Sequence, residues 1–277
     1  MNPANAAEQC LRDGDPVGAL AQLQEAVRAN PADSKLRIFL FQLLSVMGQW
    51  DRALNQLNVA AELDPGALAM AQMYREALHC EVLRTQVFEG KKSPLVFGQP
   101  EQWLALVIEA LLLTGQGKYR EAGILRTRAF EEAGATTGTL DGQPFTWIAD
   151  ADTRLGPVCE AIINGRYYWV PFSRLTGIVI DAPEDLRDVV WMPAHFQFDN
   201  GGESVALIPT RYSGSETSDD AQVVLARKTV WVEAAPDVYH GYGQRLFATE
   251  NGEVPLMDIR KIVLGSGEAG SSDSAAS

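Results

Sequence analysis

The apolar positions of the first 65 residues follow a helical rhythm that repeats after 34 residues. A turn glycine, small residues and a closing proline return at this period, in the pairs Gly14/Gly48, Ala19/Ala53, Ala26/Ala60 and Pro31/Pro65. A 34-residue period with small residues at fixed points is the signature of tetratricopeptide repeats, in which each unit is a pair of antiparallel helices. Stacked repeats of this kind form extended binding surfaces. We therefore expect this part of the chain to hold a partner rather than to catalyse a reaction.

Helical patterning continues to about residue 133. Residues 67–89 predict one long helix, which would cap the apolar edge left by the second repeat. A third, degenerate unit occupies 101–133, where Arg126 falls at the position of Leu23 and Leu57 in the earlier units. The glycine-rich segment 134–138 then ends the helical periodicity. These boundaries predict a helical repeat domain over residues 1–137.

The pattern changes to short β-rich runs between residues 138 and 264. Asn164-Gly165 separates two such runs, 158–163 and 166–172, and an Asn-Gly pair is the strongest short hairpin signal. Further hairpins are predicted for 194–198 with 204–208 and for 244–249 with 254–263, and further strands for 176–181 and 228–233. Short strands at this spacing favour a small barrel or a curled sheet. The predicted fold class is α+β with two domains, followed by a disordered tail over 265–277.

Charge narrows the range of partners. The chain carries 23 basic and 36 acidic residues, a net charge of −13. Residues 1–137 contribute −3 (13 basic, 16 acidic) and residues 138–277 contribute −10 (10 basic, 20 acidic). An acidic surface repels phosphate groups, which argues against nucleic acid and anionic membranes as partners. The sequence shows no secretion signal and no apolar run long enough to span a bilayer, so we expect a cytoplasmic protein.

The residue types used in catalysis and metal binding form no strong motif. Cys10, Cys80 and Cys159 are widely spaced and predict free thiols rather than disulfides or a zinc site. Asp150 and Asp152 could hold a divalent ion, but such residues more often cap turns. The sequence predicts no catalytic residue, no metal site and no cofactor.

Several longer motifs carry a resemblance to a known family. They are the runs 145–158, 163–172, 183–191, 243–250 and 255–261, together with Glu81 and Arg84 on the long helix. The chain resembles the ImpE/TagJ family of type VI secretion accessory proteins up to about residue 264. The resemblance implies a non-enzymatic, cytoplasmic bacterial protein that binds the small contractile-sheath subunit TssB through the N-terminal helix of that subunit. It also implies a link to ClpV, the ATPase that recycles the sheath.

The repeats suggest where a partner helix would bind. The first helices of stacked units line a concave groove that can accept another helix. Periodicity places eight residues in this hypothetical partner-binding groove: Glu8, Leu11, Arg12, Lys35, Ile38, Gln42, Ser45 and Val46.

Two other functions remain open at this point. The acidic C-terminal part could be a small-molecule enzyme that uses Asp150, Asp152 and His195, provided that these groups converge in one pocket. The repeats could instead belong to a general chaperone for a different client protein.

Overall fold

The computed structural model describes residues 3–99 and 101–265. Two helical hairpins open the chain, α1 (Pro3–Arg12) with α2 (Pro16–Ala29) and α3 (Ser34–Val46) with α4 (Trp50–Leu63). The predicted repeats are therefore confirmed as helix pairs. Gly14 and Gly48 adopt φ values of 82° and 65° at the two turns, a conformation that glycine adopts at little cost. The Asp15 side chain caps α2 by accepting a hydrogen bond from the Gly18 amide at 2.8 Å.

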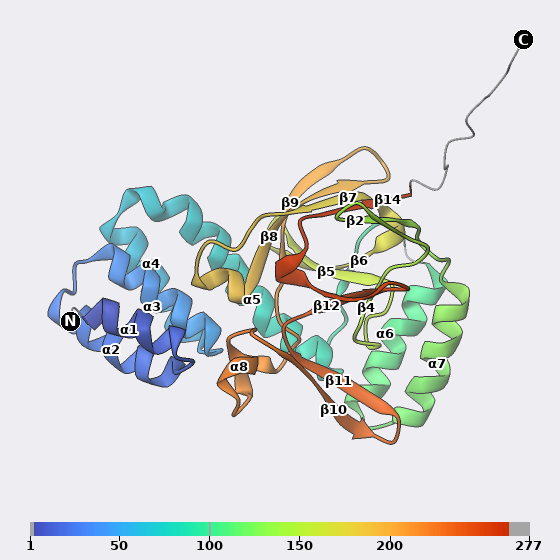
Figure 1. Cartoon of the computed structure of the whole chain (residues 1–277), viewed down its shortest axis with the longest axis horizontal. Coiled ribbons are helices and arrows are strands. Elements are labelled where there is room, and N and C mark those ends of the chain that lie inside the picture. Colours follow the sequence, from blue (N-terminus) through green and yellow to red (C-terminus); the bar gives the residue numbers. More distant parts are fainter. Residues whose placement is uncertain (1–2, 100, 266–277) are drawn as a thin grey trace, which may run out of the picture.

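The long helix predicted for 67–89 is present as α5 (Leu68–Phe88), after a short 3₁₀ turn, η1 (Pro65–Ala67). The third hairpin is also present, as α6 (Gln102–Gly115) and α7 (Tyr119–Glu132). Figure 1 places α6 and α7 on the opposite side of α5 from α1–α4, so the third hairpin does not extend the stack of the first two. Helix α5 instead joins two helical groups and packs against strand β6.

The C-terminal part is built on an open sheet of nine strands. Their order is β1 (Leu95–Val96), β6 (Arg166–Pro171), β5 (Val158–Ile163), β9 (Glu203–Pro209), β8 (Trp191–Phe198), β7 (Leu175–Ile180), β14 (Lys261–Leu264), β2 (Gly138–Leu140) and β3 (Gln143–Phe145). Only β1 pairs in parallel; the other neighbours are antiparallel. Because β1 and β3 remain edge strands, the sheet does not close, and the barrel alternative is wrong.

The remaining strands form two small sheets. One contains β13 (Gly252–Pro255), β12 (Leu246–Thr249) and β4 (Ala149–Asp150), and the other is the hairpin of β10 (Thr229–Ala235) and β11 (Val238–Gly243). The predicted Asn164-Gly165 turn is confirmed, with φ values of 49° and 73° at its two residues. The hairpin of β8 and β9 is confirmed as well.

Each face of the large sheet contributes side chains to a different buried cluster. Trp169, Trp191 and Leu207 pack with side chains of the helices, whereas Phe196 packs with Phe247 of the small three-stranded sheet. Helices and sheet thus share a core, and β1 lies within residues 1–137. The division into separate units 1–137 and 138–264 stays a prediction.

Residues 213–221 contain short helical turns. These are η4 (Ser215–Thr217) and the start of α8 (Ala221–Val224), which pack beside the repeat turns: a Cβ added at Gly48 would lie 2.5 Å from Cγ of Glu216. Three further 3₁₀ turns are η2 (Phe172–Arg174), η3 (Leu186–Val189) and η5 (Leu256–Asp258). Apart from Gly265, the predicted disordered tail lies outside the described residues.

Candidate partner-binding groove

An open groove of about 790 Å³ lies between helices α1 and α3 and a segment of the C-terminal part. Its lining consists of Ala4, Glu8, Leu11, Arg12, Lys35, Leu36, Phe39, Gln42, Pro183, Glu184, Asp185 and Leu186. Five of the eight residues predicted from periodicity are in this set. The structure therefore forms a groove where the first helices of the repeats were expected to provide one, while its role in binding stays a prediction.

The other three predicted residues do not line the groove. Ile38 is half-buried outside the lining, and Ser45 and Val46 are completely buried. The Ser45 hydroxyl donates to the Phe41 carbonyl at 2.9 Å within the helix, and Val46 belongs to the core shared with the sheet. The expectation that Ser45 and Val46 face an open groove was wrong, because the chain itself covers the C-terminal half of α3.

Segment 183–186, which lines the groove, was not predicted to meet the repeats. Residues 183–186 lead into η3, which packs against α3. The start of η3 is stabilised locally, because Asp185 and Asp188 form a reciprocal capping box. No local signal reports contact with a helix more than 130 residues earlier in the chain.

Two arginines of the C-terminal part bind the C-terminal ends of the groove helices. Arg227 donates to the carbonyls of Leu11 and Arg12 at 2.6 and 3.2 Å, and Arg211 donates to the carbonyl of Val46 at 2.8 Å. The last carbonyls of a helix lack partners within the helix and carry partial negative charge, so a guanidinium stabilises them. Both helices that form the groove are thereby fixed to the C-terminal part.

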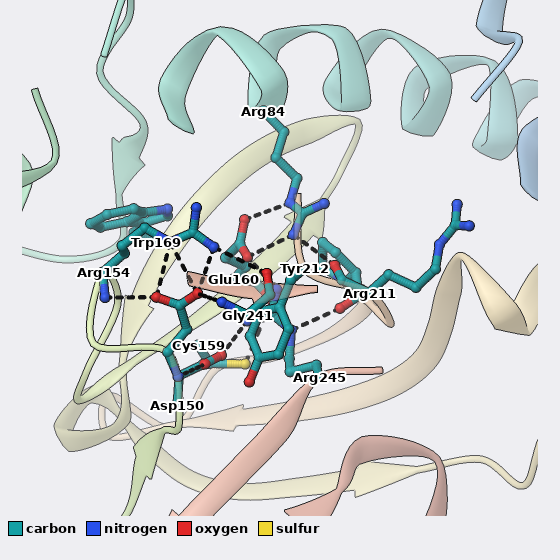
Figure 2. A network of polar contacts seen from close by, with 12 residues as sticks. Arg84, Asp150, Arg154, Cys159, Glu160, Trp169, Arg211, Tyr212, Gly241 and Arg245 are labelled. Carbon is teal, nitrogen blue, oxygen red and sulfur yellow. Dashed lines mark hydrogen bonds and ion pairs between the residues drawn. The ribbon is translucent and has the colours of Figure 1, made fainter. Parts of the chain in front are cut away.

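A buried network of charges joins α5 to the sheet (Figure 2). Glu160 on β5 accepts hydrogen bonds from Arg84 of α5 at 2.7 and 3.0 Å, and it also pairs with Arg245 and Tyr167. Burial by itself would raise the pKa of Glu160, but the two arginines outweigh this effect and lower it to about 2. On α5, Glu81 extends the network by accepting a hydrogen bond from the Trp191 indole at 3.0 Å.

The two aspartates considered as candidate catalytic groups belong to the same buried region. Asp150 pairs with Arg245 (Figure 2). Asp152 binds Arg154 and accepts a hydrogen bond from the Gly241 amide at 2.9 Å. Each also caps a local turn, since the Asp152 amide donates to Asp150 at 2.8 Å and the Arg154 amide donates to Asp152 at 2.9 Å. Burial raises the pKa of Asp150 to about 7 despite the attraction of Arg245.

His195 does not join these aspartates. It is exposed on β8, between Val179 and Val205 of the neighbouring strands, whereas Asp150 and Asp152 are buried. The pocket that Asp150 lines includes neither Asp152 nor His195. The convergence that the enzyme alternative requires is therefore not formed.

Three further features would bear on function: metal-binding side chains, paired cysteines and helices that could cross a membrane. Across residues 3–99 and 101–265, no three His, Cys, Asp or Glu side chains gather in a metal-binding arrangement. The three cysteines are free thiols as predicted; Cys80 and Cys159 are buried and Cys10 is half-buried. None of the helices in the described part of the chain combines the length and the apolar character needed to cross a bilayer.

Comparison with known proteins identifies the family. Residues 142–263 match the model of the ImpE protein family, and residues 11–77 match a tetratricopeptide repeat model. The chain is 50% identical over 256 residues to the type VI secretion system accessory component TagJ of Pseudomonas aeruginosa, covering 92% of this chain and 90% of that protein. The chain belongs to the ImpE/TagJ family. The family resemblance noted in the sequence is thus confirmed.

A solved structure extends the comparison to the whole fold. The crystal structure of protein VPA1032 from Vibrio parahaemolyticus superposes with a TM-score of 0.86 at 25% identity, covering 95% of this chain and 98% of the other. The arrangement of repeats and open sheet is therefore shared across nearly the full length of both chains.

Proposed function

We propose that this protein is a non-enzymatic accessory component of a type VI secretion system that binds the sheath subunit TssB through the N-terminal helix of that subunit. The observation that carries the proposal is the groove between α1 and α3, which has an open side and half-buried apolar residues in its lining. The relative from Pseudomonas aeruginosa supports it, because half of the residues are identical and that protein is named as such an accessory component.

The groove has the properties that a partner helix requires. Amphipathic helices bind by placing an apolar face, with anchors at positions i, i+3, i+4 and i+7, into an apolar groove. Here Leu11, Leu36 and Phe39 supply apolar surface, and charged side chains surround them. A volume of about 790 Å³ can accept several side chains from one face of a helix.

The site of action follows from the partner. A protein that binds a subunit of the contractile sheath acts in the bacterial cytoplasm, where the sheath assembles. We place it near the step at which the ATPase ClpV recycles the sheath. Neither nucleic acid nor a membrane takes part in this role, in agreement with the net charge of −13.

Co-purification tests the proposal. The tagged chain is expressed together with the secretion gene cluster and isolated, and bound proteins are identified by mass spectrometry. We expect TssB in the complex, and we expect it to be lost when the N-terminal helix of TssB is deleted. Absence of TssB in the presence of the intact cluster would contradict the proposal, and recovery of an unrelated client would favour a general chaperone.

A further inference from the structure

The groove has a second wall, and that wall comes from the C-terminal part of the chain. Residues 183–186 line the groove together with α1 and α3. We propose that this wall takes part in recognition, so that the partner helix lies between the repeats and segment 183–186 and is contacted by both. This inference rests on the proposed function, since it takes the N-terminal helix of TssB as the occupant.

The second wall is held firmly in place. The Asp188 carboxylate accepts hydrogen bonds from the amides of Glu184 and Asp185 at 2.6 and 2.9 Å, and the Asp188 carbonyl accepts one from the Thr210 hydroxyl at 2.6 Å. The guanidinium of Arg187 lies 5.0 Å from the ring centre of Tyr74 on α5. A wall fixed in this way needs no ordering on binding, which favours affinity.

Some charged groups that line the two walls form ion pairs within the chain, and others do not. Glu8 pairs with Arg12 at 3.8 Å on α1, and Asp185 pairs with Arg187 at 2.7 Å in the second wall. In each of these pairs the two opposite charges compensate each other, so the pair offers little net charge to a partner.

Glu184 and Lys35 differ from those pairs. Within the described part of the chain, neither the Glu184 carboxylate nor the Lys35 ammonium forms an ion pair, and both residues are exposed. One negative charge therefore lies on the wall from the C-terminal part and one positive charge on the wall from α3. Complementary charges at such positions fix the orientation of a partner and speed its association.

These charges define the class of partner. It is an amphipathic helix with an apolar face for Leu36 and Phe39, a basic residue placed to meet Glu184 and an acidic residue placed to meet Lys35. A second copy of this chain is a poor occupant, because each copy carries a net charge of −13 and the two would repel each other.

A titration with matched charge reversals tests this arrangement. The full chain is titrated with a synthetic peptide of the TssB N-terminal helix from the same secretion cluster. We expect Glu184→Lys to weaken binding about tenfold, because attraction is replaced by repulsion. Glu233→Lys is the matched control: it makes the same charge change at an exposed position on β10 that does not line the groove, and we expect less than about a twofold effect. A peptide in which one basic residue is changed to Glu should bind the Glu184→Lys chain better than the unchanged chain.

Three outcomes would overturn the inference, and they are distinguishable. If Lys35→Glu weakens binding while Glu184→Lys behaves like Glu233→Lys, the second wall takes no part, although the proposed function stands. If the unchanged chain does not bind the peptide at all, the proposed function falls and this inference falls with it. If Glu184→Lys changes the oligomeric state of the chain in sedimentation experiments without affecting the peptide, the groove is an interface between copies.

Discussion

The guanidinium of Arg211 donates a hydrogen bond of 2.8 Å to the carbonyl of Val46, the last residue of α3. The two residues are separated by 165 positions in the chain, and both are buried. Arg211 also binds the Val224 carbonyl, while its own carbonyl accepts a hydrogen bond from Arg84 of α5 at 2.8 Å. Arg211 thus links α3 and α8 through its side chain and α5 through its main-chain carbonyl, and it helps to fix the position of the groove.

Replacing Arg211 should therefore lower the free energy of unfolding more than replacing Arg227, which binds the C-terminal end of α1. Arg211→Met leaves two buried carbonyls without a partner, and we expect the free energy of unfolding to fall by about 2–4 kcal/mol. Arg227→Met is the control, because that arginine is exposed and water can replace its hydrogen bonds; we expect at most about 1 kcal/mol. Denaturant unfolding followed by circular dichroism measures both values. Equal losses would contradict the role given to Arg211.

Periodicity places both Val46 and Ile38 in the groove, but an aspartate at these two positions should lower the stability of the protein to different extents. Val46→Asp places a charge in the core, because Val46 is 0% exposed, and we expect it to destabilise the protein by more than about 3 kcal/mol. Ile38→Asp changes a half-buried position and should cost clearly less. Thermal unfolding of the two variants measures this difference in stability. A Val46→Asp protein as stable as the unchanged chain would show that α3 is open along its whole length.

The buried network predicts a dependence of stability on pH. The pKa of Glu160 is lowered from its ordinary value of 4.5 to about 2 in the folded protein, so the folded state holds fewer protons than the unfolded state between these values. The resulting stabilisation is complete above about pH 4.5 and is lost as the pH falls towards 2. Urea unfolding at a series of pH values should show this loss in the unchanged chain.

Removal of the Glu160 charge tests the same network. Glu160→Gln leaves Arg84 and Arg245 without their shared partner, and we expect it to cost about 3–5 kcal/mol near neutral pH. The difference between variant and unchanged chain should shrink as the pH falls, since protonation neutralises Glu160 in the unchanged chain. Glu184→Gln is the control, because this exposed residue forms no ion pair in the described part of the chain; its effect should stay within about 0.5 kcal/mol. A difference that is constant with pH would contradict the pKa assignment.

The turn glycines allow a comparison of backbone strain with and without crowding. Gly48 and Gly117 have φ values of 65° and 74°, so Gly→Ala at either position costs about 1–2 kcal/mol through the backbone alone. A Cβ at Gly48 would also meet Glu216 at 2.5 Å, whereas one at Gly117 would meet nothing within 4 Å. We expect Gly48→Ala to be the more destabilising variant in chemical unfolding. The reverse order would show that η4 does not pack against the repeat turn.

The features that the sequence predicted are those encoded by nearby residues. The 34-residue period located two helical hairpins, and Asn164-Gly165 located the turn between β5 and β6, because both signals depend on local backbone preferences. Periodicity along α1 also selected Glu8, Leu11 and Arg12, all of which line the groove.

The features that the sequence did not predict depend on contacts between distant residues. Val46 has the helical position of a groove residue, but Arg211 and the surrounding core cover it. Asp150 and Asp152 looked like possible metal ligands, and only the fold reveals that Arg245 and Arg154 bind them. The same holds for segment 183–186, whose position beside α3 follows from the path of β7 and β8.

Hydrogen exchange of the full chain with and without the TssB N-terminal helix peptide tests the central claim most directly. If the groove holds the partner helix, the peptide should slow amide exchange in α1, in the N-terminal half of α3 and in residues 183–189, and leave the β10–β11 hairpin unchanged. Binding of the peptide with protection confined to other parts of the chain, or with no protection in α1 and α3, would contradict the account.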